Sequence, residues 1–304
     1  MYDCIIIGAG PAGMTAAIYT ARRKLNTLVL AKEVGGQMVW SADVENYTGF
    51  TMVTGADLTL KFQEHMASLK EDLEVQLGVE VAKLEKNITS FAVEDTKGNV
   101  FYAKTVIIAS GKLPRHLGVP GEKELFGKGV AICATCDGPL YKDKNVAVVG
   151  GGNSAMDAIC ALSKVAKQVY VINMSDDYTG EGIVKDKIMQ FPNVRTYHSA
   201  KVTKISGKDR VEGMTIQVLG KPDEELAVNG IFVEIGYDPS ISFADIVDKN
   251  EHHEIKVDKD LQTSVPGIFA AGDINDAWGE QIIIAAGEGA KAAMAVSNYL
   301  TNLK

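Results

Sequence analysis

The stretch Asp3-Cys4-Ile5-Ile6-Ile7-Gly8-Ala9-Gly10-Pro11-Ala12-Gly13 decides the fold. Its first five residues are mostly apolar and β-branched, the pattern of a short, buried parallel strand. The glycines that follow have the spacing G-x-G-x-x-G, and helix-type sequence continues over residues 14–23. In this strand–turn–helix order, Gly8 makes the tight turn, Gly10 lets the backbone approach a pyrophosphate, and Gly13 lets the helix pack on the strand. We therefore expect a nucleotide-binding unit at the start of the chain.

A second unit of the same kind is expected in the middle of the chain. The apolar run 146–149 leads into Gly150-Gly151-Gly152-Asn153-Ser154-Ala155, which has the pattern G-x-G-x-x-A. The next strand, expected over residues 168–172, ends where a dinucleotide site places its specificity residue, about 20 residues on. Residues 173–177 there read Asn-Met-Ser-Asp-Asp, with no Arg or Lys for the 2′-phosphate of NADP and with acids that come late for NAD. Whether this turn holds any ligand is left open.

A Cys-x-x-Cys pair precedes the second unit, in Cys133-Ala134-Thr135-Cys136-Asp137-Gly138-Pro139. Two thiols at this spacing can close a small ring and cycle between dithiol and disulfide. In a reducing compartment such a pair is more often redox-active or metal-binding than a structural staple. Zinc needs four ligands, but Cys4 lies in the first expected strand, Cys160 lies in an expected helix, and the five histidines show no ligand spacing. No metal site is expected.

Composition limits the class of protein. With 304 residues the chain can form two domains, and 46% hydrophobic residues with 30 Gly and 8 Pro fit an α/β protein. A net charge of −8 argues against general nucleic-acid binding. There is no apolar run of about 18 residues, so no membrane span is expected. The N-terminus leads directly into a strand without a signal-type segment, and a cytoplasmic location is therefore expected.

Two further segments belong to the first nucleotide-binding unit. Its second strand is expected over residues 27–30. Ala31 and Lys32 stand where an acid usually binds a ribose, and Glu33 comes just beyond that position. Near the end of the chain, a strand over residues 267–271 is followed by Gly272-Asp273, and a helix is expected over residues 285–300. A carboxylate at this position suits a sugar or ribitol hydroxyl, although an ordinary turn aspartate has the same pattern.

Taken in order, the motifs resemble the low-molecular-weight thioredoxin reductase family, FAD-containing disulfide reductases, over essentially the whole chain. The matching motifs are Gly8-x-Gly10-x-x-Gly13, Gly35-Gly36-Gln37, Glu45-Asn46-Tyr47-x-Gly49-Phe50, Cys133-Ala134-Thr135-Cys136-Asp137-Gly138, Gly150-x-Gly152-Asn153-Ser154-Ala155, and Gly272-Asp273 with Gln281 and Ala286-Gly287-Glu288-Gly289. The resemblance implies a homodimer and two Rossmann-like domains of three-layer ββα type. An FAD domain (1–112 and 242–304) is split by a redox-active, NAD(P)H-binding-like domain (113–241).

The resemblance also implies roles for individual residues. Cys136 faces the flavin, Cys133 attacks the disulfide of thioredoxin, and Asp137 moves the proton, with a plain turn aspartate as the alternative. The helix that starts after Gln281 places its positive end near the flavin N1–O2 edge. The residues implied to bind FAD are Gly8, Gly10, Pro11, Ala12, Gly13, Gly36, Gln37, Asn46, Gly111, Gly272, Asp273, Gln281 and Ile282.

The sequence departs from the family at the expected NADPH site. NADPH-using members carry His-Arg-Arg and a further Arg where this chain has Asn173-Met174-Ser175 onward, and usually Lys or Arg where it has Glu280. Each lost Arg–phosphate contact costs about 1.5–3 kcal/mol. We therefore expect the subgroup that takes electrons from reduced ferredoxin, with NADH as the next option. Arg22-Arg23-Lys24, and Lys112 with Arg115, are candidate basic patches for an acidic ferredoxin.

Three alternatives stay open. One is an NADH- or NADPH-dependent reductase of a thioredoxin or peroxiredoxin system, since segments around Cys136 and Gly150 also resemble the flavoprotein component of alkyl hydroperoxide reductase. Another is an FAD-binding redox sensor or partner protein. A third is an NADP-type oxidoreductase that passes electrons to ferredoxin, although the cysteine pair argues against it. Trp278 either stacks on the isoalloxazine, where a nicotinamide would otherwise dock, or packs in the core or an interface.

Overall fold

The computed structural model describes residues 1–41, 44, 46–69, 71 and 73–303. The chain divides into two compact units, which we call the split unit (Met1–Leu113 with Asp238–Lys304) and the inserted unit (Pro114–Tyr237). The sequence placed these boundaries after residues 112 and 241. The chain segments that cross between the units form strands β7 (Lys112–Pro114) and β16 (Tyr237–Pro239), which pair with each other.

The split unit is built on a mostly parallel sheet. Strand β1 lies at its centre because Cys4, Ile5 and Ile6 are fully buried, as the middle strand of a sheet covered on both faces must be. The sheet order is β3-β2-β1-β6-β5-β4, and β17 pairs with β6. The strands are β1 (Tyr2–Ala9), β2 (Thr27–Val34), β3 (Leu73–Leu77), β4 (Val81–Lys86), β5 (Phe91–Asp95), β6 (Val100–Ile108) and β17 (Ile268–Ala270).

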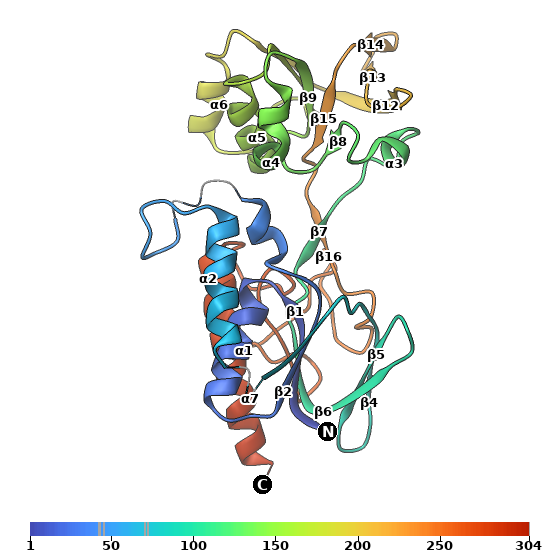
Figure 1. Cartoon of the computed structure of the whole chain (residues 1–304). Helices are drawn as coiled ribbons and strands as arrows, with labels where there is room; N and C mark the ends of the chain where they lie inside the picture. The colour runs from blue at the N-terminus through green and yellow to red at the C-terminus, as the bar shows by residue number, and fades with distance from the viewer. Residues whose placement is uncertain (42–43, 45, 70, 72, 304) are drawn as a thin grey trace. The chain divides into compact units, whose positions relative to one another are not determined.

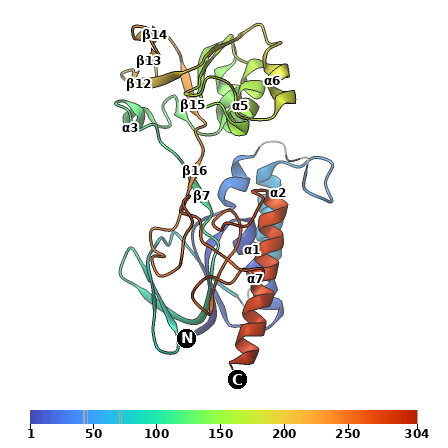
Figure 2. The same cartoon turned by 180° about the vertical axis from the view of Figure 1, so that it is seen from behind.

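Two hydrophobic cores lie on opposite faces of this sheet. Helices α1 (Pro11–Arg22), α2 (Gly55–Ala67) and α7 (Ile282–Asn302) cover one face, as Figures 1 and 2 show. The core on that face contains Met14 of α1, and the core on the other face contains Leu84 and Val93 of the antiparallel pair β4–β5. The split unit is therefore three layers thick, and a short 3₁₀ helix, η1 (Gly36–Trp40), follows β2.

The inserted unit repeats the scheme with a five-stranded parallel sheet in the order β11-β10-β9-β15-β8. Helices α5 and α6 share one core with the sheet, and the antiparallel sheet β12-β13-β14 shares the other. The elements are α3 (Glu122–Leu125), β8 (Val130–Ala131), α4 (Ala134–Asp137), η2 (Gly138–Tyr141), β9 (Asn145–Val149), α5 (Asn153–Ser163), β10 (Gln168–Ile172), α6 (Gly182–Ile188), β11 (Val194–Tyr197), β12 (Ala200–Ser206), β13 (Gly213–Val218), β14 (Glu224–Leu226) and β15 (Gly230–Val233). The α/β fold expected from the sequence, with Rossmann-like sheets, is confirmed.

Several helices and strands begin or end at residues that differ from those expected from the sequence. Helix α1 begins at Pro11, since proline is favoured at the first helical position, and α7 begins at Ile282 rather than at residue 285. Strand β2 continues to Val34 because Ala31 pairs with β3 and Val34 pairs with β1. Lys32 therefore lies within a strand, where its Nζ is 2.9 Å from Glu80 Oε1.

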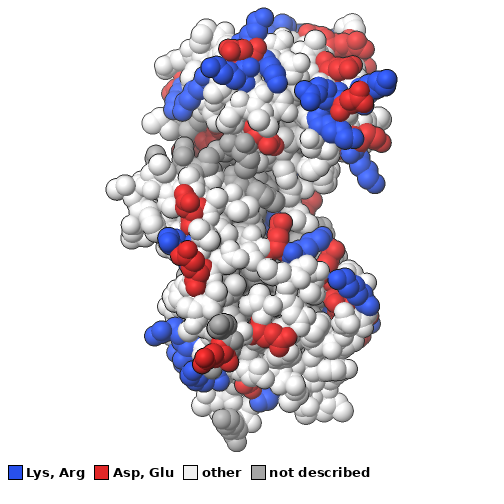
Figure 3. Space-filling model, in the orientation of Figure 1, with Lys and Arg blue, Asp and Glu red and all other residues white. Residues whose placement is uncertain are grey.

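The helices and the charged surface bear on two expectations from composition. Among the helices that the described residues form, none combines the length and apolar character that crossing a bilayer requires. On the face shown in Figure 3, basic and acidic side chains are interspersed over each unit. That pattern differs from the continuous basic surface by which proteins usually bind nucleic acids.

Candidate cofactor cradle and redox site

The turn after β1 leaves room for a ligand at one glycine only. Gly8 has a φ of +109°, and a Cβ there would lie 2.2 Å from the Ala109 carbonyl oxygen. A Cβ on Gly13 would lie 2.0 Å from the Gly8 oxygen. A Cβ on Gly10, by contrast, would meet nothing nearer than the Gly35 oxygen at 3.9 Å. Packing of the chain requires glycine at positions 8 and 13, whereas Gly10 borders open space that fits a pyrophosphate.

The N-terminus of α1 is suited to an anion. Gly10 is its N-cap residue and Pro11 its first residue; no side chain caps it, and its first turn has no acidic residue. Backbone N–H groups at such an end attract a phosphate. Ala12 packs closely against the C-terminal part of the unit, since a Cβ on Gly289 would lie 2.1 Å from its oxygen and one on Gly272 would lie 3.0 Å from its Cβ.

Several of the residues expected to bind FAD converge from distant segments. The Asn46 Nδ2 donates to Gln281 Oε1 at 2.8 Å, and Gln281 is the N-cap of α7, directly before Ile282. The Gln37 Nε2 donates to the carbonyl oxygen of Lys112, next to Gly111, at 3.3 Å. Gly36, one residue before Gln37, also approaches the first turn, since a Cβ there would lie 3.5 Å from the Gly10 Cα. The structure thus brings the segments around residues 10, 36, 46, 111 and 281 into the split unit's cradle.

Asp273 follows β17 and Gly272 and is only partly exposed. The pKa of its carboxyl is raised to about 6, chiefly by burial and also by the negative charges of Glu280 and Glu288, while Lys112 opposes the shift. The turn is fixed by Glu288, whose Oε2 accepts from the Gly272 N–H at 2.8 Å and from Asn275 Nδ2 at 2.7 Å. A carboxyl held in this way can accept a hydrogen bond from a sugar hydroxyl.

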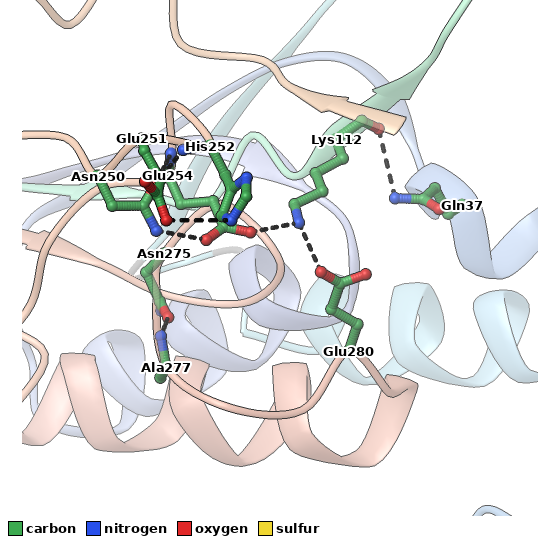
Figure 4. A network of polar contacts seen from close by, with 9 residues as sticks. All are labelled: Gln37, Lys112, Asn250, Glu251, His252, Glu254, Asn275, Ala277 and Glu280. Atoms are coloured by element: carbon green, nitrogen blue, oxygen red, sulfur yellow. Dashed lines mark hydrogen bonds and ion pairs between the residues drawn. The ribbon is translucent and has the colours of Figure 1, made fainter. Parts of the chain in front are cut away.

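An ion cluster centred on the poorly exposed Lys112 side chain borders the cradle, and the sequence did not indicate it. Lys112 Nζ lies 2.7 Å from Glu254 Oε1 and 2.5 Å from Glu280 Oε1, and its side chain is 9% exposed. Figure 4 shows Lys112 pointing between the two carboxylates, away from Gln37. Burial lowers the pKa of Lys112, but the two carboxylates raise it by more. The prediction that Lys112 belongs to an exposed basic patch is wrong, because the side chain points inward and is already paired.

Trp278 lies two residues before Glu280 of this cluster and is 95% exposed. The core-packing alternative for Trp278 is therefore wrong. Stacking on an isoalloxazine stays a prediction, as does packing in an interface.

The cysteine segment lies in the inserted unit, where the chain leaves the parallel sheet. Cys133 directly precedes α4 and is disulfide-bonded. The side chains of Thr135 and Cys136 lie outside the described residues, so a pairing of Cys133 with Cys136 stays a prediction. Asp137 is partly exposed, and its N–H donates to the Cys133 oxygen at 3.1 Å.

The two remaining cysteines are free thiols, and burial raises the pKa of both. Cys4 is buried in β1, and burial raises the pKa of its thiol to about 12. Burial also raises the pKa of the Cys160 thiol on α5. Since the thiolate is the nucleophile in disulfide exchange, neither thiol is suited to that reaction.

The glycine turn of the inserted unit has the same geometry as the first. Gly150 has a φ of +141°, and a Cβ there would lie 2.1 Å from the Glu234 oxygen. Gly152 is the N-cap of α5, and a Cβ on it would meet only Thr179 Oγ1 at 3.8 Å. A Cβ on Gly151, however, would lie 2.4 Å from Asn173 Oδ1. A side chain from the end of β10 therefore fills one flank of this turn.

The loop over residues 173–181 is bonded to that turn. Asn173 is 3% exposed, accepts from the Ser175 N–H at 3.0 Å and donates to the Asp177 oxygen at 2.9 Å. The Thr179 N–H donates to the Gly151 oxygen, and the Glu181 N–H donates to Asn153 Oδ1, each at 2.9 Å. The carboxylate of Asp177 forms an ion pair with Lys185 of α6. A 2′-phosphate would need free cations here. The loop instead has polar groups that are hydrogen-bonded to one another, and it carries two carboxylates, Asp176 and Asp177.

Comparisons with known proteins agree with this architecture. A family model described as pyridine nucleotide-disulphide oxidoreductase matches residues 2–289. The F component of alkyl hydroperoxide reductase from Staphylococcus aureus (strain NCTC 8325 / PS 47) is 38% identical over 301 residues, which are 98% of this chain and 59% of that protein. The chain thus spans well under two thirds of the length of this curated relative.

Among solved structures, thioredoxin reductase from Lactococcus lactis is similar with a TM-score of 0.89 and 32% identity, over 99% of this chain and 100% of that one. Thioredoxin reductase from T. acidophilum is similar with a TM-score of 0.86 and 36% identity, over 100% and 99% of the two chains. Both likenesses extend over the cradle and the cysteine segment.

Proposed function

Because the chain belongs to the pyridine nucleotide-disulphide oxidoreductase family, we propose that it is an FAD-dependent disulfide reductase that reduces thioredoxin through Cys133 and Cys136. FAD is the cofactor of the thioredoxin reductase branch that the chain matches from end to end. The observation that carries the proposal is the disulfide-bonded Cys133, placed where the chain leaves the parallel sheet of a unit built like a nucleotide-binding domain.

The cradle of the split unit fits FAD. Gly10 and the uncapped start of α1 would hold the pyrophosphate, and Asp273 would hold a sugar or ribitol hydroxyl. Gln37 and Asn46 would also contact FAD, as the resemblance implies, and the start of α7 after Gln281 would lie near the flavin ring. FAD, when bound, supplies the two-electron chemistry that a disulfide requires.

The cysteine segment performs the exchange with the partner. Cys133 as thiolate attacks a sulfur of the thioredoxin disulfide, and Cys136 then displaces the reduced partner by attacking Cys133. Asp137, whose N–H is bonded to the Cys133 oxygen, takes or gives a proton during the exchange. Free Cys4 and Cys160 take no part, because burial raises the pKa of both thiols.

We further propose that reduced ferredoxin, rather than NADPH, supplies the electrons, and that the chain acts as a homodimer in the cytoplasm. The donor assignment is supported by the loop after β10, where the polar groups of Asn173 are already bonded and Asp176 and Asp177 replace basic residues. It is also supported by Glu280, which is paired with Lys112 where NADPH-using relatives have a cation.

One observation favours a second candidate. The 38% identity to the F component of alkyl hydroperoxide reductase from Staphylococcus aureus extends over 98% of this chain. A reductase of a peroxiredoxin system that uses NADH would carry acids rather than cations after β10, as this chain does at Asp176 and Asp177.

The donor is tested by anaerobic mixing. The flavin-loaded protein is mixed separately with NADPH, NADH and reduced ferredoxin, and the bleaching of the flavin band is followed. The proposal expects fast bleaching by ferredoxin, and fast bleaching by NADPH would overturn it. If NADH bleaches the flavin and a peroxiredoxin-system partner is then reduced in preference to thioredoxin, the second candidate replaces the first.

A further inference from the structure

Glu234 occupies a position that the mechanism has not used. It directly follows β15, the strand between β9, which leads into the glycine turn, and β8, which leads into the cysteine segment. The Glu234 N–H donates to the Val149 oxygen of β9 at 2.8 Å. On its other edge, β15 pairs with β8 in parallel, and Phe232 lies opposite Ala131. Two residues further along the two segments, Glu234 follows β15 and Cys133 follows β8. The sheet therefore directs Glu234 and Cys133 to the same edge.

The side chain of Glu234 is directed toward α4 and α5. Along a strand, residues two apart point to the same face. Phe232 packs in the core formed with α5, which also contains Ala134 at the start of α4, whereas Val233 packs in the opposite core. The backbone N–H of Ala134 hydrogen-bonds the Glu234 carboxyl, in agreement with this direction. The carboxyl thus contacts the residue that directly follows Cys133.

The surroundings of this carboxyl disfavour a charge. The pKa of Glu234 is raised to about 8, chiefly by burial and also by the negative charge of Asp157 on α5, while the Ala134 N–H opposes the shift. Tyr237 faces it from β16, and its pKa is raised by burial and by Glu234. The other acidic group near the pair is Asp137 at the end of α4, which directly follows Cys136 in the sequence. Near pH 7 a largely neutral acid is therefore held against Ala134, the residue that follows Cys133.

We propose that Glu234 is a proton donor and acceptor for the Cys133–Cys136 pair, in addition to Asp137. The proposal deepens the proposed function and rests on it for the electron supply. Two electrons from the reduced flavin, or from a small dithiol, cleave the S–S bond to give two thiolates. Glu234 gives its O–H proton to one sulfur and becomes a carboxylate, and solvent protonates the other. When the pair reduces a partner disulfide, the S–S bond forms again and the carboxylate takes a proton back.

The proton affinities of the two groups favour this exchange. A free thiol has a pKa of about 8.5, close to that of the buried acid, and proton transfer is most efficient between groups of similar pKa. A carboxylate beside a thiolate also repels it, so the two groups titrate as a coupled pair. This coupling gives a signature that depends on charge and that a purely structural role of Glu234 would not produce.

The test measures thiol titration in the full chain. Cys4 and Cys160 are both replaced by Ala, the cysteine pair is reduced with dithiothreitol, and the rate of alkylation by iodoacetamide is followed by mass spectrometry from about pH 6 to 10. The parent should show the titration of the two thiols together with a further step from Glu234. Glu234→Gln should lose that further step, with equal rates below about pH 7 and roughly 3- to 10-fold faster alkylation near about pH 9. Superimposable profiles would overturn the proposal.

Matched variants make the result specific. Glu225→Gln removes an exposed carboxylate from β14 of the same unit and should leave the profile of the parent unchanged; a change as large as that of Glu234→Gln would overturn the proposal. Glu234→Asp keeps an acid and should keep the step that the acid adds. If circular dichroism shows that the Gln variant is unfolded, Glu234→Met, which also removes the charge, replaces it. The readout uses neither flavin nor thioredoxin. A chain that fails to reduce thioredoxin but keeps this signature refutes the proposed function without refuting the proton role.

Discussion

Alanine at two glycines of the first turn separates binding of FAD from folding. The two replacements add the same methyl group to neighbouring parts of one motif. At Gly13 the new Cβ would lie 2.0 Å from a carbonyl oxygen, whereas at Gly10 the nearest protein atom is 3.9 Å away. The Gly10 backbone is extended, with φ −77° and ψ −172°, so alanine fits there without strain. Gly10→Ala should therefore affect the ligand, and Gly13→Ala should affect the fold.

The magnitudes follow from these distances. The methyl group of Gly10→Ala would occupy the space assigned to the pyrophosphate and displace it from at least one backbone N–H. A charge-assisted hydrogen bond contributes about 1.5–3 kcal/mol, so the Kd for FAD should rise roughly 10- to 100-fold. The free energy of unfolding of the apoprotein should change by less than about 1 kcal/mol. Gly13→Ala forces α1 away from β1 and should destabilise the apoprotein by more than about 2 kcal/mol.

Both quantities are measured on apoprotein from which the flavin has been removed. Titration with FAD, followed by the change in flavin fluorescence, gives the Kd, and urea denaturation followed by circular dichroism gives the free energy of unfolding. If Gly10→Ala binds FAD as the unmodified chain does, the pyrophosphate does not lie at Gly10 and the cradle is assigned incorrectly. If Gly13→Ala leaves stability unchanged, the close packing of α1 on β1 is not what requires glycine there.

Three further predictions concern the redox pair, the ion cluster and the flavin-side carboxyl. Cys133→Ser should keep reduction of the flavin by its donor but lose reduction of thioredoxin, measured with insulin as final acceptor, while Cys160→Ser keeps both; a fully active Cys133→Ser variant would remove the assigned nucleophile. Lys112→Met leaves Glu254 poorly exposed and without its cation, and should lower the free energy of unfolding in urea by about 1–3 kcal/mol. Lys61→Met, which breaks an exposed pair with Glu64, should cost less than about 0.5 kcal/mol, and equal losses would contradict the burial argument. Because the folded-state pKa of Asp273 is raised to about 6, the folded apoprotein binds more protons than the unfolded chain between about pH 4 and 6, so its stability should fall by up to about 2 kcal/mol as the pH rises through this range. Asp273→Asn should remove that fall, and an unchanged pH profile would show that burial does not raise this pKa.

Most of the fold could be predicted from the sequence because the patterns that indicate strands, turns and helices lie within short segments. The apolar run before Gly8 and the glycine spacing predicted a strand, a turn and a helix, and all three are present. The ends were less well predicted, since β2 continues past Leu30 through pairing with β1 and β3, which are distant in sequence. Pairing of this kind depends on the neighbouring strands and leaves no mark in the strand's own residues.

The candidate site likewise contains residues that the sequence predicted and residues that it did not. Gly8, Gly10 and Gly13 could be assigned from their spacing, because each position has its own steric reason. The Lys112 cluster could not, because Glu254 and Glu280 are far from Lys112 in sequence and only the fold brings them to its Nζ. Glu234 was missed for a related reason: a glutamate after a strand has no motif, and its meaning comes from the contact with Ala134 across the sheet edge.

An anaerobic reductive titration tests most directly whether a flavin and a cysteine pair work together in this chain. Dithionite is added to the flavin-loaded protein, and the electrons taken up are counted from the flavin spectrum and from the free thiols that appear. The unmodified chain should take up about four electrons, two at the flavin and two at the disulfide, and Cys133→Ser should take up about two. An uptake of about two electrons by both proteins would show that no disulfide accepts electrons beside the flavin, and would contradict the assignment of this chain as a disulfide reductase.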